Sequence, residues 1–205
     1  TLLLFFTFGA IFGQGAYQFP NSDFESWDSD GLPTSWYSFS DIKCDLSGLA
    51  ALGCSSAKEN HHNKLSGADA QSGYSIDIYV KSVIGVKANG AISTGRTRVA
   101  STNATEGVNY NYDPSDYRWT FKGRPDSISF YAKKISGYSH GGNAYFKVFI
   151  HDGNTFYDKA DGTLQGTSYG SMLYPFYPTA NWNRFVKKVT YTNTTAIPQL
   201  ILASF

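Results

Sequence analysis

Two short patterns in the sequence contain residue types that could do chemistry. GTSYG at 166–170 matches G-x-S-x-G, which in some hydrolases holds a nucleophilic serine between a strand and a helix. Two prolines follow closely and disfavour that helix, so we expect Ser168 to be a loop serine without a catalytic role. His61 and His62 are adjacent, and adjacent residues of a strand point to opposite faces, so we do not expect them to share one metal ion. A solvated loop is predicted for this pair.

The acidic residues do not reveal a catalytic centre. Residues 150–162 contain Asp152, Asp158 and Asp161, but the spacing of an EF-hand calcium loop is missing, and a hairpin with Asp-Gly turns is predicted instead. Hydrolysis of a glycosidic bond requires two carboxyl groups about 5–10 Å apart. The chain has 16 Asp and Glu residues, so such a pair could form by chance, and no pattern selects one. We therefore assign no catalytic residue and leave open whether the protein is an enzyme.

Aromatic side chains give the sequence its clearest potential for ligand binding. Residues 170–183 form a predicted loop that contains Tyr174 and Tyr177, and Tyr138 and Trp119 are further candidates. Binding sites combine such flat apolar surfaces with a few polar groups, a combination that suits sugars. The alternative is that loop aromatics only cover the end of a β-sandwich. We predict that at least one of Tyr138, Tyr174 and Tyr177 contacts a carbohydrate.

The composition fits an exported β-protein. The chain has 17 basic and 16 acidic residues, a net charge of +1 and no basic stripe, so nucleic acid and anionic membranes are not expected partners. Only 16% of the residues are charged, whereas 17% are aromatic and 20 are glycine. Aromatic residues fit the half-buried surface of strands, and glycine is typical of turns, so this balance favours an extracellular β-fold.

The N-terminus and the cysteines also indicate export. Residues 1–15 read as part of a signal peptide, because Leu2 to Phe12 form an apolar run too short to span a bilayer and small residues precede a cleavage point before Ala16. Export makes a disulfide between Cys44 and Cys54 plausible, with two free thiols as the alternative. A zinc pair is not expected, since the CxxC spacing is missing.

Alternation of apolar and polar residues predicts most of the strands. The pattern holds at 74–83, 126–135 and 144–152, and the Gly-, Ser- and Asn-rich link between the last two predicts an antiparallel hairpin. Residues 183–192 form a strand whose less regular pattern fits a bulge. Residues 198–205 are apolar on both faces, as in a central strand.

The pattern of elements predicts an all-β sandwich of jelly-roll type. Helix signals are weak and confined to single turns at 47–53 and 113–119. Many strands with turn-rich links and no alternating helices favour a sandwich over an α/β fold. The sequence stops at Phe205 inside an apolar run, so we expect residues 16–205 to form one domain that is truncated at its C-terminus and lacks its last strand.

Several segments resemble known carbohydrate-associated domains. NSDFESW at 21–27 with LPTSW at 32–36, and SGYSIDIY at 72–79, resemble the entrance and a strand of jelly rolls of the carbohydrate-binding-module type. FKGRPDSISFYAKK at 121–134 and the run at 181–205 resemble the family called the putative carbohydrate metabolism domain, which occurs on exported bacterial proteins. The resemblance covers about residues 18–205, with unmatched stretches between the four segments.

This resemblance implies a structural calcium ion at the first motif. In jelly rolls of the binding-module type the corresponding Glu helps to hold Ca²⁺, so Glu25 becomes the candidate ligand, with Asn21 and Asp23 as helpers. Ca²⁺ requires six to eight oxygen ligands, so one carboxylate with carbonyls is not a complete site. The alternative is that Asn21 and Asp23 form an Asx-turn while Phe24 and Trp27 fill the core. No other cofactor is expected.

The resemblance also implies a function and a location. It implies a protein of the periplasm or cell surface of a Gram-negative-type bacterium, or a secreted one, with a glycan or polysaccharide as partner. A non-catalytic glycan-binding module is the leading hypothesis, with a glycoside hydrolase and a structural or adhesive surface protein as alternatives. Arg124 stands at the start of a strand, where the resemblance implies hydrogen bonds to carbonyls that tie strand ends together.

Overall fold

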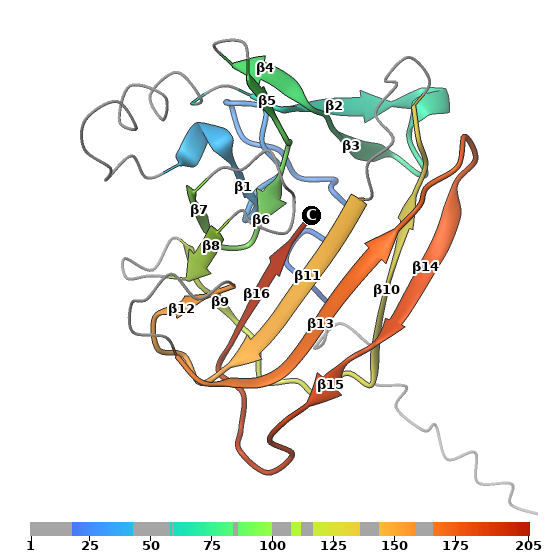
Figure 1. Ribbon diagram of the computed structural model, residues 1–205. Coiled ribbons are helices and arrows are strands. Elements are labelled where there is room, and N and C mark those ends of the chain that lie inside the picture. The colour runs from blue at the N-terminus through green and yellow to red at the C-terminus, as the bar shows by residue number, and fades with distance from the viewer. Residues whose placement is uncertain are drawn as a thin grey trace, which may run out of the picture.

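The computed structural model describes residues 18–42, 58, 60–83, 86–99, 108–111, 117–135, 144–158 and 166–205. Within these ranges the chain is almost entirely β-structure, and neighbouring strands pair in the antiparallel sense (Figure 1). The helical elements of the described part are two short 3-10 helices, Phe39–Asp41 and Gly67–Asp69. The predicted all-β class is confirmed, whereas the jelly-roll topology stays a prediction.

The largest sheet combines strands from distant parts of the sequence. β16 lies near its middle, as predicted for residues 198–205, and all five of its residues are buried. Figure 1 shows β16, β11 and β13 side by side through the centre of the molecule. The order is β1 (Tyr37–Ser38), β6 (Ile92–Ser93), β16 (Leu200–Ser204), β11 (Ala144–His151), β13 (Ser168–Phe176) and β15 (Thr190–Tyr191), with β9 (Trp119–Thr120) also paired to β16.

Smaller sheets lie around this central one. β10 (Ser127–Ala132) pairs with β14 (Asn183–Lys188). β8 (Val108–Asn111) lies between β7 (Arg96–Val99) and β12 (Phe156–Tyr157). Two hairpins, β2 (His62–Ser66) with β3 (Tyr74–Ile78) and β4 (Lys81–Val83) with β5 (Val86–Ala88), lie at the top of Figure 1.

The two faces of β11 are covered by different sheets. Phe146, Val148 and Ile150 point into the main core, where the Phe146 ring meets Phe130 of β10 at 5.0 Å. The alternate residues, Lys147, Phe149 and His151, face the β7–β8–β12 sheet, which they contact through the side chains described below. The central sheet is therefore buried on both sides at β11, which explains why polar residues of this strand are inside the protein.

The predicted hairpin between residues 126–135 and 144–152 is wrong. β10 pairs with β14, and β11 pairs with β13 and β16. The sequence pattern located both strands by their apolar faces. These faces pack against each other across the core, whereas the two strands of a hairpin would pair along their edges. β12 pairs with β8 and not with β11, and the Asp161–Gly162 part of the hairpin predicted at 150–162 lies outside the described residues.

The strand predicted at 183–192 changes sheets halfway. β14 pairs with β10 up to Lys188, and β15 pairs with β13 from Thr190 onward. Between them the buried Val189 donates its N–H to the Asp126 carbonyl, at 3.0 Å. The irregular pattern that suggested a bulge thus marks the crossing from one layer to the other.

Three local predictions are also overturned. The first half of the predicted loop at 170–183 belongs to strand β13, and Ser168 is the first residue of that strand. Pro175 misled the prediction, although a proline is compatible with a strand where its missing N–H is not needed.

His61 and His62 are buried instead of solvated, because His61 packs against Phe39 at 4.9 Å and His62 lies 3.1 Å from the Gly31 carbonyl.

Some predictions fall outside the described residues. These are the signal peptide at 1–15, the cysteine pair Cys44 and Cys54, Tyr138, the turn at 47–53 and most of the segment at 113–119. The prediction for Arg124 is confirmed, since its guanidinium donates to the carbonyls of Asn193, at 2.7 Å, and Ala196. A search of the described ranges found no helix long and apolar enough to cross a membrane.

Candidate functional site

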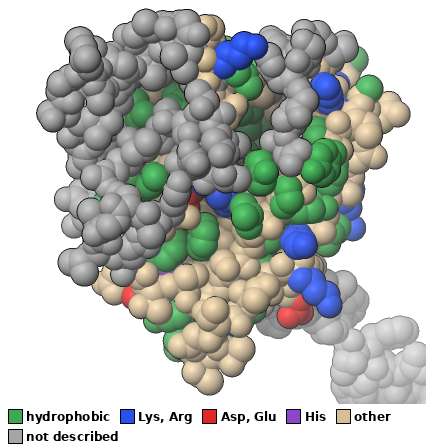
Figure 2. All heavy atoms as spheres, viewed as in Figure 1, with side chains coloured by type: hydrophobic (Ala, Val, Ile, Leu, Met, Phe, Trp, Pro, Cys, Tyr) green, Lys and Arg blue, Asp and Glu red, His purple; other side chains and the backbone are tan. Residues whose placement is uncertain are grey.

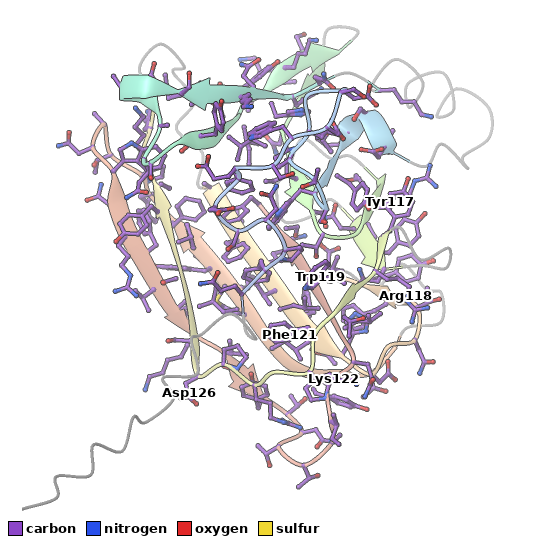
Figure 3. The ribbon with its side chains drawn as sticks, turned by 180° about the vertical axis from the view of Figure 1, so that it is seen from behind. Tyr117, Arg118, Trp119, Phe121, Lys122 and Asp126 are labelled. Carbon is purple, nitrogen blue, oxygen red and sulfur yellow. The ribbon has the colours of Figure 1, made fainter. Side chains whose placement is uncertain are left out.

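A large groove lies among the described residues. Its volume is about 1980 Å³, and two uninterrupted runs of residues, 71–80 and 127–135, line it. The first run contains β3 and the second contains β10. Seen from behind in Figure 3, β3 crosses the top of the molecule and β10 runs down one side, so the two strands form adjoining walls. They meet at one corner, where Lys133 forms an ion pair with Asp69 at 3.1 Å.

The groove follows the edges of the two strands. Side chains of successive strand residues point to opposite faces, so a groove on one face would be lined only by alternate residues. Here every residue from 71 to 80 and from 127 to 135 contributes. In the described part of the chain, β3 pairs only with β2 and β10 pairs only with β14. The edge of each strand that has no neighbour therefore borders the groove.

The interior of the groove is aromatic. Phe205 lies among its lining residues, and its ring stacks on Phe146 with 4.0 Å between centroids and 6° between planes. Phe130 meets Phe205 edge-on at 5.1 Å and Phe176 at 4.8 Å. Rings in edge-to-face and stacked pairs contribute stability beyond the area that they bury. This floor is preformed and apolar.

Glu25 closes one end of the β3 edge. Its Oε1 accepts a hydrogen bond from the Tyr74 backbone N–H at 2.9 Å. Gly73, at φ +51°, allows this approach, because a Cβ atom there would lie 2.0 Å from Glu25 Oε1. The residue that sequence analysis selected as a metal ligand thus binds backbone on a neighbouring strand.

A double substitution separates the two roles of Gly73. Gly73→Ala should lower the free energy of unfolding by about 1–2 kcal/mol from the left-handed backbone alone, and more because the Cβ displaces Glu25. In a Glu25→Ala background the same substitution should cost only the backbone part. Urea denaturation of the four proteins measures both values. Equal costs in the two backgrounds would show that the Glu25 contact is unimportant.

Asn21 and Asp23 take part in the turn before Glu25. Asn21 Oδ1 accepts from the Ser26 N–H at 3.0 Å, its amide donates to the Ser26 carbonyl at 2.7 Å, and Asp23 Oδ1 accepts from the Glu25 N–H at 3.4 Å. Within the ranges that the structure describes, no group of three or more His, Cys, Asp or Glu side chains is arranged to hold a metal ion. Calcium binding at Glu25 therefore stays a prediction.

Three aromatic side chains line the groove on β10 and in the β13–β14 connection. We call Tyr131, Tyr177 and Trp182 the aromatic rim; all three line the groove. Tyr131 is 52% exposed and Tyr177 67% exposed. The Trp182 indole N–H is buried, and the structure gives it no hydrogen-bond partner. Figure 2 shows hydrophobic side chains with Lys and Arg among them beside the upper ends of β11 and β13.

Polar groups surround the aromatic rim. Lys133 Nζ lies 5.4 Å from the centre of the Trp182 ring. The exposed Arg184 donates to Ser129 Oγ at 3.1 Å, and the Asn183 amide donates to Thr179 Oγ1 at 2.6 Å. Of these polar residues, Lys133, Arg184 and Ser129 line the groove together with the aromatic rim.

The predicted sugar contacts separate into exposed and covered residues. Tyr177 lies in the aromatic rim, as an exposed side chain. Tyr174 is half-buried against Phe130 and Phe185, at 6.1 and 6.3 Å. Trp119, labelled in Figure 3, belongs to β9 and packs against the core. Tyr131 was missed, although its outward position in the alternating strand at 126–135 could have revealed it.

Two buried polar clusters lie on the other face of β11. Lys147 Nζ lies 2.7 Å from Asp158 Oδ2, and Asp158 also accepts from the N–H and side-chain amide of Asn109, at 2.8 and 3.0 Å. His151 Nε2 lies 2.7 Å from Asn111 Oδ1. Burial, with Asp152 opposing and Arg118 assisting, lowers the His151 pKa to about 4. A ring with 0% exposure cannot meet a substrate, so His151 is structural.

Comparisons of the chain with family models, with curated protein sequences and with solved structures found no match. Function is therefore inferred below from the groove, the aromatic rim and the charges around them.

Proposed function

We propose that this chain is a non-catalytic glycan-binding module of jelly-roll type, secreted or displayed on a bacterial cell surface. The observation that carries the proposal is the aromatic rim, where Tyr131 and Tyr177 expose more than half of their surface at the mouth of a preformed groove. Exposed apolar surface beside a groove often marks a ligand-binding site. The resemblance of the chain to carbohydrate-associated domains supports a sugar as that partner.

The groups around the rim suit the chemistry of sugars. A pyranose ring has an apolar face that stacks on an aromatic side chain and hydroxyls at its edge that require donors and acceptors. Lys133 and Arg184, which both line the groove, supply ammonium and guanidinium groups. Sites that combine apolar surface with a few placed polar groups bind small ligands in a fixed orientation.

A glycoside hydrolase is the second candidate, favoured by one observation. Burial raises the pKa of Asp77, which lines the same groove as Glu25 and Asp23. A raised carboxyl pKa is a feature that general acids of glycoside hydrolases share. However, Glu25 is engaged with the Tyr74 N–H, so the partner carboxylate is not free. An assay for reducing sugar released from a bound glycan tests this alternative. Release by the wild-type chain that is lost in Asp77→Asn would establish an enzyme and replace the binding module.

Binding to a glycan array tests the proposal. The wild-type chain should bind at least one glycan, and Tyr177→Ala and Tyr131→Ala should each weaken that binding about tenfold, the effect of about 1.4 kcal/mol. Val186→Ala is the matched control, because Val186 is 48% exposed on β14, the strand paired with β10, but does not line the groove. Titration calorimetry would give the affinities.

The same array, run with calcium and then with EDTA, tests the metal proposal separately. If Glu25, Asn21 and Asp23 hold Ca²⁺ that shapes the groove, EDTA should abolish binding. Binding that persists in EDTA would remove the metal and keep the module. If no glycan binds under either condition, the proposed function is wrong.

A further inference from the structure

A lysine, a carboxyl group and a side-chain amide meet in the interior between β11 and the β7–β8–β12 sheet. Lys147 of β11 is 8% exposed, Asn109 of β8 is 5% exposed, and the side chain of Asp158 is 0% exposed. One oxygen atom, Asp158 Oδ2, lies 2.7 Å from Lys147 Nζ and accepts a hydrogen bond from Asn109 Nδ2 at 3.0 Å. Because both nitrogens contact the same atom, the amine of Lys147 lies close to the amide of Asn109.

The hydrogen bonds around Asn109 fix the orientation of its amide. Its Nδ2 donates to Asp158, and its Oδ1 accepts from the Thr97 hydroxyl of β7 at 2.9 Å. A flipped amide would set its carbonyl oxygen against the carboxylate, so that two acceptors would face each other. The Thr97 hydroxyl therefore donates to the oxygen on which negative charge develops when a nucleophile attacks the amide carbon.

The backbone holds the amide and the carboxyl group together. The Asn109 N–H donates to Asp158 Oδ1 at 2.8 Å, and the Asp158 N–H donates to the Asn109 carbonyl at 2.9 Å. Asn109 also pairs with Thr97 across the β7–β8 ladder. Three neighbouring positions of one sheet thus supply the amide, the acid and the hydroxyl, and the facing sheet supplies the amine.

We propose that Lys147 and Asn109 join to each other in an intramolecular isopeptide bond, with Asp158 as the catalytic residue. Lys147 Nζ gives a proton to the Asp158 carboxylate within their hydrogen bond, which leaves an uncharged amine and an uncharged acid. The amine attacks Asn109 Cγ, and Asp158 relays a second proton from Nζ to Nδ2. The Cγ–Nδ2 bond then breaks, ammonia leaves, and Asp158 ends as an uncharged acid. No oxidant, reductant or other reactant is needed.

The site supplies what an unreactive amide requires. A nucleophile that is held against its target can act at an effective concentration of about 10⁵ M or more. The low exposure of the three side chains also excludes water, which would otherwise compete with the amine for the amide carbon. A desolvated lysine beside a proton acceptor is a recognised form of activated nucleophile. This reaction is independent of the proposed glycan binding.

The bond would join the central sheet to the sheet that covers it, since Lys147 belongs to β11 and Asn109 to β8. Before it forms, the side chains make the buried ion pair and hydrogen bonds described above. Lys147→Met removes the ion pair and the bond together, and its double variant with Asp158→Asn also lacks the bond, so these two proteins remain comparable with each other.

Mass spectrometry of the purified wild-type chain, after reduction of any disulfide, tests the proposal. Its mass should be lower than the mass calculated from its sequence and measured N-terminus by one ammonia, about 17 Da. Trypsin does not cleave after a lysine whose amine is acylated, so the digest should contain a branched peptide made of residues 99–118 and 135–159. An amide between Lys147 and Asp158 would link residues within 135–159 alone, with loss of water, and would overturn Asn109 as the acceptor.

Lys147→Arg is the matched control, because arginine keeps a positive charge beside Asp158 but is not deprotonated to a nucleophile. It should have the full calculated mass and should melt about 5 °C or more below the wild-type chain, which the link constrains when it unfolds. Asp158→Ala keeps both reacting groups and should also have the full mass. Thr97→Val should acquire the bond more slowly after synthesis.

The wild-type measurement decides the outcome even if a variant fails to fold. A wild-type digest that yields residues 99–118 and 148–159 as separate peptides would overturn the proposal. A loss of ammonia that persists in Lys147→Arg would overturn it as well, because that loss would come from another residue.

Discussion

Replacement of Lys147 by methionine should lower the free energy of unfolding by about 3–5 kcal/mol, the usual cost of leaving a buried charge without its partner. The Asp158 side chain has 0% exposure, and Lys147 Nζ lies 2.7 Å from its Oδ2. Methionine fills similar space, so lost packing contributes little. Asn109 and Ser204 would still donate to Asp158 but could not neutralise it. Guanidinium denaturation of both proteins measures the loss.

The double variant Lys147→Met, Asp158→Asn is the control for this prediction. Its asparagine keeps an acceptor for the Asn109 N–H and carries no charge, so it should be clearly more stable than Lys147→Met alone. This ordering follows because removal of both members of a buried ion pair is much cheaper than removal of one. A loss below about 1 kcal/mol in the single variant, the value typical of surface pairs, would show that water reaches Asp158.

Acidification from pH 6.5 to pH 4 should remove up to about 3 kcal/mol of stability through His151 alone. Burial in the folded protein holds the pKa of His151 at about 4, against an ordinary value of 6.5 for histidine. Between these two pH values His151 is protonated in the unfolded chain but neutral in the folded protein. Protonation therefore stabilises the unfolded state relative to the folded state. The contribution of neutral His151 to the free energy of unfolding is fully present above pH 6.5 and is lost as the pH falls toward 4. Urea denaturation across this range measures it.

The substitution His151→Gln should flatten this part of the stability profile. Glutamine can keep a hydrogen bond to Asn111, although it loses the ring contact with Phe156 at 4.7 Å, so the variant starts from a lower stability. Burial also lowers the pKa of His62, which leaves a residual slope of the same sign. An unchanged slope in His151→Gln would mean that the His151 ring is accessible to water and protonates in the folded protein.

Some of the strands, β10 and β11 among them, were predictable from the sequence, but their partners were not. Alternation locates Ile128 and Phe130 on one face of β10 and Phe146 and Val148 on one face of β11, and both faces are buried as expected. The same pattern does not distinguish two strands that share an edge from two that face each other across a core. Burial of β11 on both faces depends on β8 and β12, which are too short to carry a pattern of their own.

The site was only partly predictable for the same reason. Tyr177 was selected by its type and its position between prolines, and it is exposed at the groove. Tyr174 belongs to β13, where the presence of Pro175 led us to predict a loop. The contact of Glu25 with Tyr74 joins residues 49 positions apart and depends on the left-handed backbone of Gly73. No local spacing encodes such a contact.

The position of β16 has a consequence for the order in which the protein can fold during synthesis. This strand follows every other described strand in the sequence, yet it joins β11 to β6 and β9 near the middle of the main sheet. Thr94 bonds to Ile201 and Ala203, which follow it by 107 and 109 residues. Until residues 200–204 are synthesised, β6 and β11 cannot join through β16. The main sheet is therefore incomplete while most of the chain has already been synthesised. Contacts of such separation are associated with slow folding and with exposure to aggregation.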